Sequence, residues 1–108
     1  MSFGLDPQII ASITQILSRH PGIERAIIYG SRAKGTYRRG SDIDLTLVGA
    51  TMTYDDLVQI MQEFDDSSIP HKVDLSLWHF VRDPALRSHI ERWGQVLYDP
   101  SLTRLQPP

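Results

Sequence analysis

Gly30 and Ser31 stand directly after an apolar run, where a residue without a side chain and a hydroxyl can approach a phosphate closely. The same pair is common in ordinary turns, so by itself it leaves that alternative open. Two better-known phosphate motifs do not fit. A P-loop requires Lys after its second glycine, but Thr36 follows Gly35 here and Lys34 precedes it. The dinucleotide fingerprint fails as well, because no glycine stands two residues after Gly30.

Asp42, Asp44 and Asp74 are the acidic residues whose positions favour a cation site. Residues two apart on a strand share one face, about 7 Å apart along the backbone, so Asp42 and Asp44 can converge on a hard divalent cation. Asp74 alternates with Val73 and Leu75, and it joins the pair if its strand lies next to theirs. Three carboxylates at close range predict bound cations or raised pKa values. The alternatives are a turn cap at Asp42, an exposed strand end at Asp44 and a solvent-facing Asp74.

Basic residues gather between these two groups. Arg32, Lys34, Arg38 and Arg39 fall within eight positions that hold no acid, whereas residues 40–71 contain no Lys or Arg. Eight of the thirteen acidic residues fall within residues 42–74. A basic loop beside acidic positions suits an anion that carries its own metal ion, although a solvated loop followed by a polar helix is the common alternative.

Size and composition are those of one globular domain. The chain has 108 residues, of which 41% are hydrophobic and 22% charged. We therefore expect a single domain over residues 1–108, with its core at about residues 5–98. The net charge of −2 argues against general nucleic-acid binding, and the absence of cysteine excludes disulfides and thiolate zinc sites. No run approaches the roughly 20 apolar residues of a membrane span, and no export signal is evident, so a cytoplasmic protein is expected.

The elements that would position these residues follow from spacing. A helix is expected from Pro7 to the break at residues 20–22, with Asp6 as its cap. Strands are expected over residues 23–29, 42–48 and 70–78, with an edge strand over 95–98 and a loop, including one helical turn, over 30–41. Thr53 and Asp83 would begin two further helices, the latter ending at Gly94, and the last eight residues would be frayed. The residues expected in the core of these helices are Leu57, Ile60, Met61, Phe64 and Trp93.

This order of elements predicts the α/β (α+β) class, a mixed sheet with helices packed against it. Gly30 and Ser31, ten further residues, and then Asp42 and Asp44, with the later acid Asp74, resemble the DNA polymerase β-like nucleotidyltransferase superfamily. Residues 30–35 and 41–45 are most similar to the minimal nucleotidyltransferases. Those proteins are encoded beside an HEPN-domain partner, often as the antitoxin of a toxin–antitoxin pair. The resemblance runs from about residue 5 to residue 98.

The resemblance implies a metal-dependent enzyme. Asp42 and Asp44 would hold two Mg²⁺ ions, for which Mn²⁺ is an alternative, and Asp74 would complete the second site and take the proton of the attacking hydroxyl. Two ions about 4 Å apart stabilise the attacking and leaving oxygens of an in-line displacement. By the same resemblance, ATP is the expected substrate and AMP the group transferred.

The resemblance also implies how the nucleotide is bound and who receives AMP. Gly30 and Ser31 would hold the β- and γ-phosphates. From charge and proximity alone, Arg32 or Lys34 would neutralise the departing pyrophosphate. Because the chain has no segment left to enclose a small acceptor, the expected acceptor is a hydroxyl of a partner protein. The resemblance alone favours a tyrosine of the HEPN partner. A homo-oligomer is compatible with the sequence.

Three other functions compete with this interpretation. An antitoxin that masks its partner by contact alone would not need three acids on one face. A sugar-nucleotide glycosyltransferase also uses an Asp-x-Asp pair, but its fold needs a longer chain. An antibiotic-modifying nucleotidyltransferase carries a helical acceptor domain that 108 residues cannot hold.

The four histidines are interpreted as ordinary polar residues of helix ends, helix faces and strand flanks: His20, His71, His79 and His89.

Overall fold

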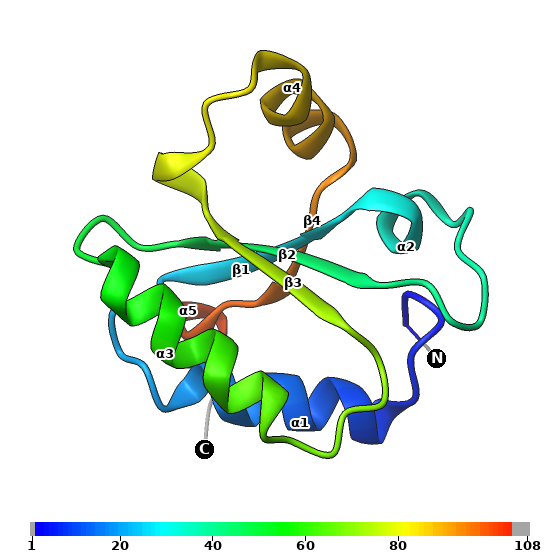
Figure 1. Ribbon diagram of the computed structural model, residues 1–108, viewed down its shortest axis with the longest axis horizontal. Helices are drawn as coiled ribbons and strands as arrows, with labels where there is room; N and C mark the ends of the chain where they lie inside the picture. Colours follow the sequence, from blue (N-terminus) through cyan, green and yellow to red (C-terminus); the bar gives the residue numbers. More distant parts are fainter. Residues whose placement is uncertain (1, 105–108) are drawn as a thin grey trace.

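A four-stranded mixed sheet in the order β3-β2-β1-β4 forms the centre of the molecule (Figure 1). The structure is a computed structural model and describes residues 2–104. The elements along the chain are α1 (Pro7–Ser18), β1 (Arg25–Tyr29), α2 (Gly30–Lys34), β2 (Ile43–Val48), α3 (Tyr54–Asp65), β3 (Val73–Leu77), the 3-10 turn η1 (Trp78–Phe80), α4 (Pro84–Trp93), β4 (Gln95–Tyr98) and α5 (Pro100–Arg104). The predicted α/β class with a mixed sheet is confirmed.

The register of the sheet decides which residues meet. β1 pairs antiparallel with β2 and with β4, and β2 pairs parallel with β3 through the crossover that contains α3. In this register Asp44 lies opposite Tyr29 on one side and opposite Asp74 on the other. The middle strand β2 therefore brings residues from three separate segments into one row across the sheet.

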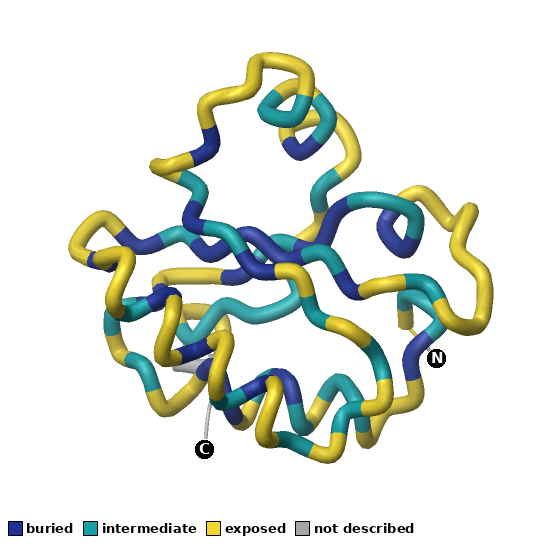
Figure 2. The backbone as a smooth tube through the Cα atoms, in the orientation of Figure 1, coloured by how far each residue is buried: buried dark blue, intermediate teal, exposed yellow. Residues whose placement is uncertain are grey.

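The two faces of the sheet are covered differently. Figure 1 shows α1 and α3 below the sheet and α4 above it. The side chains of Ile43, Leu45 and Leu47 alternate toward the α1–α3 layer and are fully buried there. Figure 2 shows this buried band along the middle strands. The alternate residues, including Asp44 and Thr46, point to the opposite face, where α2, η1 and α4 pack against the sheet.

The helices begin where local chemistry favours it. The Thr53 hydroxyl accepts from the Asp56 N–H while the Asp56 carboxylate accepts from the Thr53 N–H, which confirms the predicted capping box of α3. Asp83 caps α4 by accepting from the Ala85 N–H. Asp6 precedes α1 but makes no side-chain cap bond, so Pro7 at the first helical position begins that helix.

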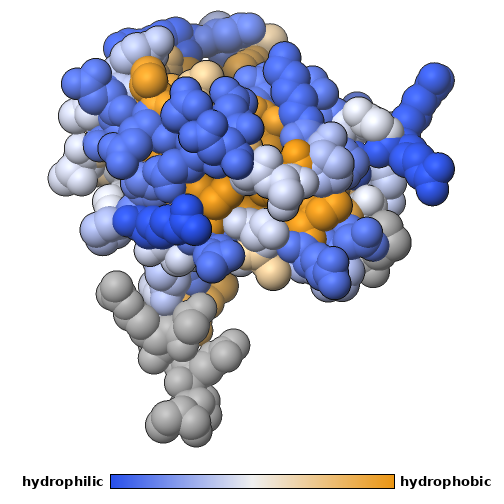
Figure 3. Space-filling view, turned by 60° about the horizontal axis from the view of Figure 1, so that its bottom comes forward, coloured by the Kyte–Doolittle hydropathy of each residue, from blue (hydrophilic) through white to orange (hydrophobic). Residues whose placement is uncertain are grey.

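Two residues expected in the core lie at the surface. Met61 is 43% exposed, because it is one residue past the buried Ile60 and so about 100° around α3. Trp93 is 39% exposed at the last turn of α4. Its ring contacts the cationic groups of Lys34 and Arg92, which keep it at the boundary with water. Figure 3, which turns the α1–α3 side toward the viewer, shows a mostly hydrophilic surface with smaller apolar areas.

The predicted boundaries need small corrections. β1 begins at Arg25 rather than at residue 23, and β3 runs only from Val73 to Leu77. Asp42 immediately precedes β2 and is not part of it. The frayed end expected from Ser101 is wrong for residues 101–104, which belong to α5, while residues 105–108 lie outside the described residues. Across residues 2–104, the helices are too short and too polar to cross a membrane.

Candidate active site

Asp44 and Asp74 are directly paired on adjacent parallel strands, so their Cα atoms are separated by about one strand spacing, ~4.8 Å. Because paired residues of parallel strands point to the same face, both carboxylates lie on the face opposite the α1–α3 layer. Asp44 is partly buried and Asp74 is exposed. Asp42 is exposed and lies just before β2, two residues from Asp44. The structure therefore brings these predicted site residues to one end of the two strands.

Asp44 is the site carboxylate whose ionisation its surroundings disfavour. Burial raises the pKa of the Asp44 carboxyl above its ordinary value, and the negative charges of Asp74 and Asp42 raise that pKa further. The positive charge of Lys72 acts in the opposite direction. The folded chain thus holds Asp44 where ionisation is unfavourable, an arrangement that a bound cation would relieve.

Gly30 lies against this carboxylate. Its φ of +74° is in the left-handed region, which glycine adopts without strain. A Cβ at this position would lie 2.3 Å from Oδ2 of Asp44. Two independent constraints, the backbone angle and the close approach of Asp44, therefore require glycine at the start of α2.

Gly30 begins the short helix α2, which is closed by Gly35 with a φ of +82°. Ser31 is partly buried, and its carbonyl accepts from the N–H groups of Gly35 and Thr36. Lys34 is exposed, and its Nζ lies 5.3 Å from the centre of the Trp93 ring. Lys34 is thus held on the α4 side of the turn.

The sequence predicted that Arg32 contacts phosphate, but in the structure its guanidinium bonds backbone carbonyls of this chain. It is only 2% exposed, although it is a charged residue in a short surface helix. Its guanidinium donates to the carbonyls of Phe3, Arg39 and Ser41 at 2.9–3.3 Å. The fixed fork of donors in arginine suits such multiple contacts. Arg32 therefore ties α2 to the N-terminal segment and to Ser41, the residue before Asp42.

His89 belongs to the site although its sequence context gave no sign of it. Nε2 of its ring accepts from the Gly30 N–H at 3.0 Å. The ring also meets the ring of Tyr29 edge-on, with 6.0 Å between centres. The signal was absent from the sequence because 59 residues separate the two partners. Only the packing of α4 over the sheet brings them together.

Tyr29 is the second residue that sequence reasoning missed, since it was interpreted only as the end of a buried strand. Burial raises the pKa of its hydroxyl, and the charges of Asp44 and Asp74 raise it further, while a hydrogen bond with Ser76 lowers it. Ser76 in turn donates to Thr46 at 2.9 Å. A neutral phenol therefore borders the carboxylates on the β1 side.

The three carboxylates are chemically suited to a divalent cation, but they are not gathered around one point. Carboxylate oxygens are the donors that Mg²⁺ takes, and their mutual repulsion at Asp44 is of the sign that a cation would cancel. However, residues 2–104 contain no group of three or more His, Asp or Glu side chains already drawn together as a metal site. The predicted convergence of three carboxylates is therefore incomplete in this structure, where Asp42 and Asp74 are exposed.

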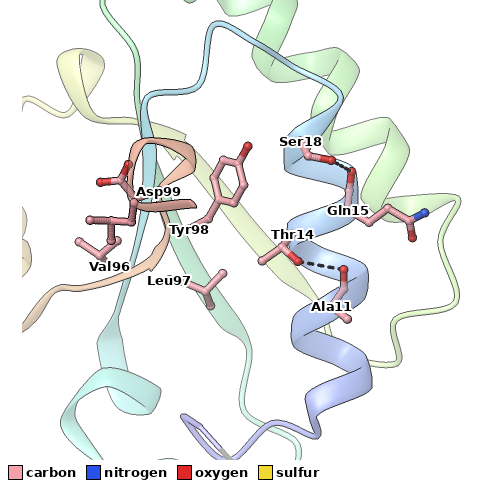
Figure 4. Close-up of a pocket in the computed structure, with 9 residues that line it drawn as sticks. Ala11, Thr14, Gln15, Ser18, Val96, Leu97, Tyr98 and Asp99 are labelled. Carbon is pink, nitrogen blue, oxygen red and sulfur yellow. Dashed lines mark hydrogen bonds between the residues drawn. The ribbon is translucent and has the colours of Figure 1, made fainter. Parts of the chain in front are cut away.

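A separate hollow of about 540 Å³ lies between α1 and the β4–α5 segment (Figure 4). Its walls include Thr14 and Gln15 of α1 and Leu97 and Tyr98 of β4. None of the predicted site residues lines this hollow. The chemistry-bearing residues instead occupy the far end of β1 and β2, beside α2 and α4.

Solved structures with the same fold include several toxin–antitoxin complexes. One is a toxin–antitoxin crystal structure with AMP-PNP, with a TM-score of 0.66, 23% identity, and coverage of 88% of this chain and 74% of the other. Another is the MntA-HepT complex, with a TM-score of 0.65, 18% identity, and coverage of 91% and 76%. A third is tri-AMPylated Shewanella oneidensis HEPN toxin in complex with MNT antitoxin, with a TM-score of 0.64, 17% identity, and coverage of 90% and 75%. At these identities the likeness shows the fold.

Comparisons with curated proteins and with family models address which family the chain belongs to. A search of curated proteins found no significant match. The model of the family described as polymerase beta, nucleotidyltransferase, matches residues 11–102, which include Gly30, Ser31 and all three site carboxylates. The predicted resemblance is thereby confirmed at the level of the family and of the fold. With a match over most of its length, this chain belongs to the polymerase beta nucleotidyltransferase family.

Proposed function

We propose that this chain transfers AMP from ATP to a hydroxyl of a partner protein of the HEPN toxin type, and that it serves as the antitoxin of that pair. The observation that carries the proposal is the packing of Gly30 against Asp44, with Asp74 paired to Asp44 on the next strand. Support for the partner comes from structural neighbours, one of which is an MNT antitoxin in complex with tri-AMPylated HEPN toxin. Another neighbour was crystallised with AMP-PNP, which supports a nucleotide as substrate.

In this proposal the loop of residues 30–35 binds the β- and γ-phosphates. Gly30 lets the backbone pass close to the carboxylates, and Ser31 offers its hydroxyl and its N–H. The exposed amine of Lys34 supplies positive charge for the departing pyrophosphate. Arg32 does not contact the nucleotide but keeps α2 and the segment before Asp42 in a fixed relation through its bonds to Ser41.

The three aspartates provide metal binding and proton transfer in this proposal. Asp42, Asp44 and Asp74 would hold Mg²⁺, which when bound supplies charge stabilisation for the attacking and leaving oxygens. The acceptor oxygen forms a bond to the α-phosphorus while the bond to pyrophosphate breaks. Asp74 is exposed to solvent at the edge strand β3, where it can take the proton of the incoming hydroxyl.

The experiment is incubation of the protein with α-labelled ATP and Mg²⁺, with and without the product of the neighbouring HEPN gene. Label is expected on the HEPN protein and is expected to fall at least ~100-fold in Asp42→Asn, because a charged metal ligand is worth several kcal/mol in the transition state. Mass spectrometry would identify the modified residue, for which a tyrosine is expected.

Two outcomes would contradict the proposal. If the protein labels a small molecule efficiently and leaves the HEPN protein unlabelled, the assigned acceptor is wrong. If Asp42→Asn protects cells from the toxin as well as the wild type does and no label is transferred by either, the chain acts by masking its partner. Thermal unfolding of Asp42→Asn serves as the control for folding, since removal of a repelling, exposed carboxylate should leave stability intact.

A further inference from the structure

We propose that His89 is a positioning residue for the loop of residues 30–35: its Nε2 holds the Gly30 N–H and so sets the orientation of the Gly30 peptide beside Asp44. The inference rests on the proposed role of Gly30 and Ser31 in nucleotide binding. It concerns a residue on α4, outside both sequence motifs that identify the site.

The hydrogen bond to Gly30 has a structural reason. Gly30 is the first residue of α2, and the N–H of a first helical residue has no partner within its own helix. His89 supplies the acceptor at 3.0 Å. An imidazole nitrogen that accepts carries no proton, so the proton of the neutral ring is on Nδ1. The edge-on contact with Tyr29 keeps the ring in the plane that this bond requires.

α4 is held firmly enough to act as a support. Ile90, the residue after His89, is only 3% exposed, and the chain at Gly94 packs against Ile27 of β1 so closely that a Cβ there would lie 2.7 Å from the Ile27 side chain. Just past the helix, the Gln95 side chain donates to the Ala33 carbonyl of α2 at 3.1 Å. α2 is therefore joined to α4 by His89 and to the first residue of β4 by Gln95, and the His89 bond is the one that reaches Gly30.

The consequence for nucleotide binding follows from the freedom of glycine. A glycine at φ +74° can rotate to other conformations at little cost once nothing holds its N–H. Without the His89 acceptor, the Gly30 peptide is expected to sample orientations in which the loop no longer fits a triphosphate. Each binding event would then require that the loop be ordered again, which lowers affinity for ATP.

The test uses two substitutions that separate the acceptor from the ring. His89→Phe keeps an aromatic ring against Tyr29 but has no acceptor, whereas His89→Gln can place an amide oxygen near the position of Nε2. The Mg²⁺–ATP affinity is measured by calorimetry, and the Gly30 amide is observed by ¹⁵N–¹H NMR. His89→Phe is expected to weaken affinity about tenfold and to shift the Gly30 amide proton upfield, as expected for loss of one oriented hydrogen bond. His89→Gln is expected to stay within about threefold of the wild type.

His79 offers a matched control. Its Nε2 donates to the Met52 carbonyl at 3.1 Å and its ring meets Phe80 edge-on, so His79→Phe removes one ring-to-backbone hydrogen bond of the opposite direction, far from Gly30. His79→Phe is expected to change stability without changing ATP affinity. Equal ATP affinity in His89→Phe and the wild type, an unchanged Gly30 amide, or a His89→Gln variant as weak as His89→Phe would each overturn the inference. If the wild type binds ATP but labels no partner, the proposed function fails while the affinities still decide the role of His89.

Discussion

The contact between Gly30 and Asp44 leads to a prediction that compares alanine substitutions at Gly30 and at Gly35. Gly30 and Gly35 both have a positive φ, +74° and +82°, so alanine at either position pays a similar backbone cost of roughly 1–2 kcal/mol. They differ in what a Cβ would meet. At Gly30 it would lie 2.3 Å from Oδ2 of Asp44, whereas at Gly35 nothing lies within 4 Å. Gly35→Ala is therefore the control for strain without a clash.

The displacement that Gly30→Ala demands can be worked out from this distance. Ordinary van der Waals contact begins at 3.4 Å, so the Asp44 carboxylate must retreat by about 1 Å from its place. A shift of that size in a reacting group can cost on the order of 100-fold in rate. In urea or thermal unfolding we expect Gly30→Ala to lose at least as much stability as Gly35→Ala, because both carry the backbone cost and only Gly30→Ala must also displace Asp44. Transfer of AMP to the HEPN partner should fall about 100-fold in Gly30→Ala alone, relative to Gly35→Ala.

Mg²⁺–ATP calorimetry on the same two variants provides a measurement that needs no partner protein. Affinity is expected to fall in Gly30→Ala and to stay near the wild-type value in Gly35→Ala. The reasoning is refuted if the two variants transfer AMP at rates within threefold of each other. It is also refuted if Gly35→Ala is the more impaired of the two in ATP binding.

Three further predictions follow from the site. Asp74→Asn should retain Mg²⁺–ATP binding in calorimetry but lose transfer, because Asp42 and Asp44 still hold the nucleotide's metal; loss of binding with normal transfer per bound ATP would contradict this division. The pKa of Asp44 is raised in the folded state, first by burial and then by the charges of Asp74 and Asp42. The contribution of Asp44 to stability is therefore greatest below its pKa in the unfolded chain, and it is lost as the pH rises through its pKa in the folded protein. Asp44→Asn should therefore raise the Tm by a few degrees at pH 7 and not at pH 3, and an equal Tm at both values of pH would argue against it. Arg32→Lys should lower the free energy of unfolding by about 2–4 kcal/mol in urea titration, since a single ammonium cannot replace a buried fork of donors; a loss below 1 kcal/mol would contradict the structural role of Arg32.

Local patterns predicted most of the secondary structure because the relevant contacts are short in sequence. The capping box at Thr53 and Asp56 needs only three residues, and it forms as expected. The alternation of Ile43, Leu45 and Leu47 with Asp44 and Thr46 predicts a strand with one apolar face, and β2 has that face buried. Errors arose at helix surfaces, as at Met61, where an apolar residue next to a buried one lies a third of a turn away.

The sequence by itself determined the family and the residue types of the site. The spacing from Gly30 and Ser31 to Asp42 and Asp44 is carried by one continuous segment, which lies within the residues 11–102 that the family model matches. The expectation that Asp74 joins the group depended on one condition, that its strand be a neighbour of β2. The register of the sheet satisfies that condition.

Only the tertiary structure decided how the other residues are used. Arg32 is in the basic cluster that suggested a phosphate contact, yet its guanidinium is buried among carbonyls of residues 3, 39 and 41. His89 gave no pattern to interpret, yet it holds the N–H of Gly30 across 59 residues of sequence. Such roles depend on which carbonyls and N–H groups are left without partners when the chain has folded. That is a property of the packed backbone, and no local run of side chains encodes it.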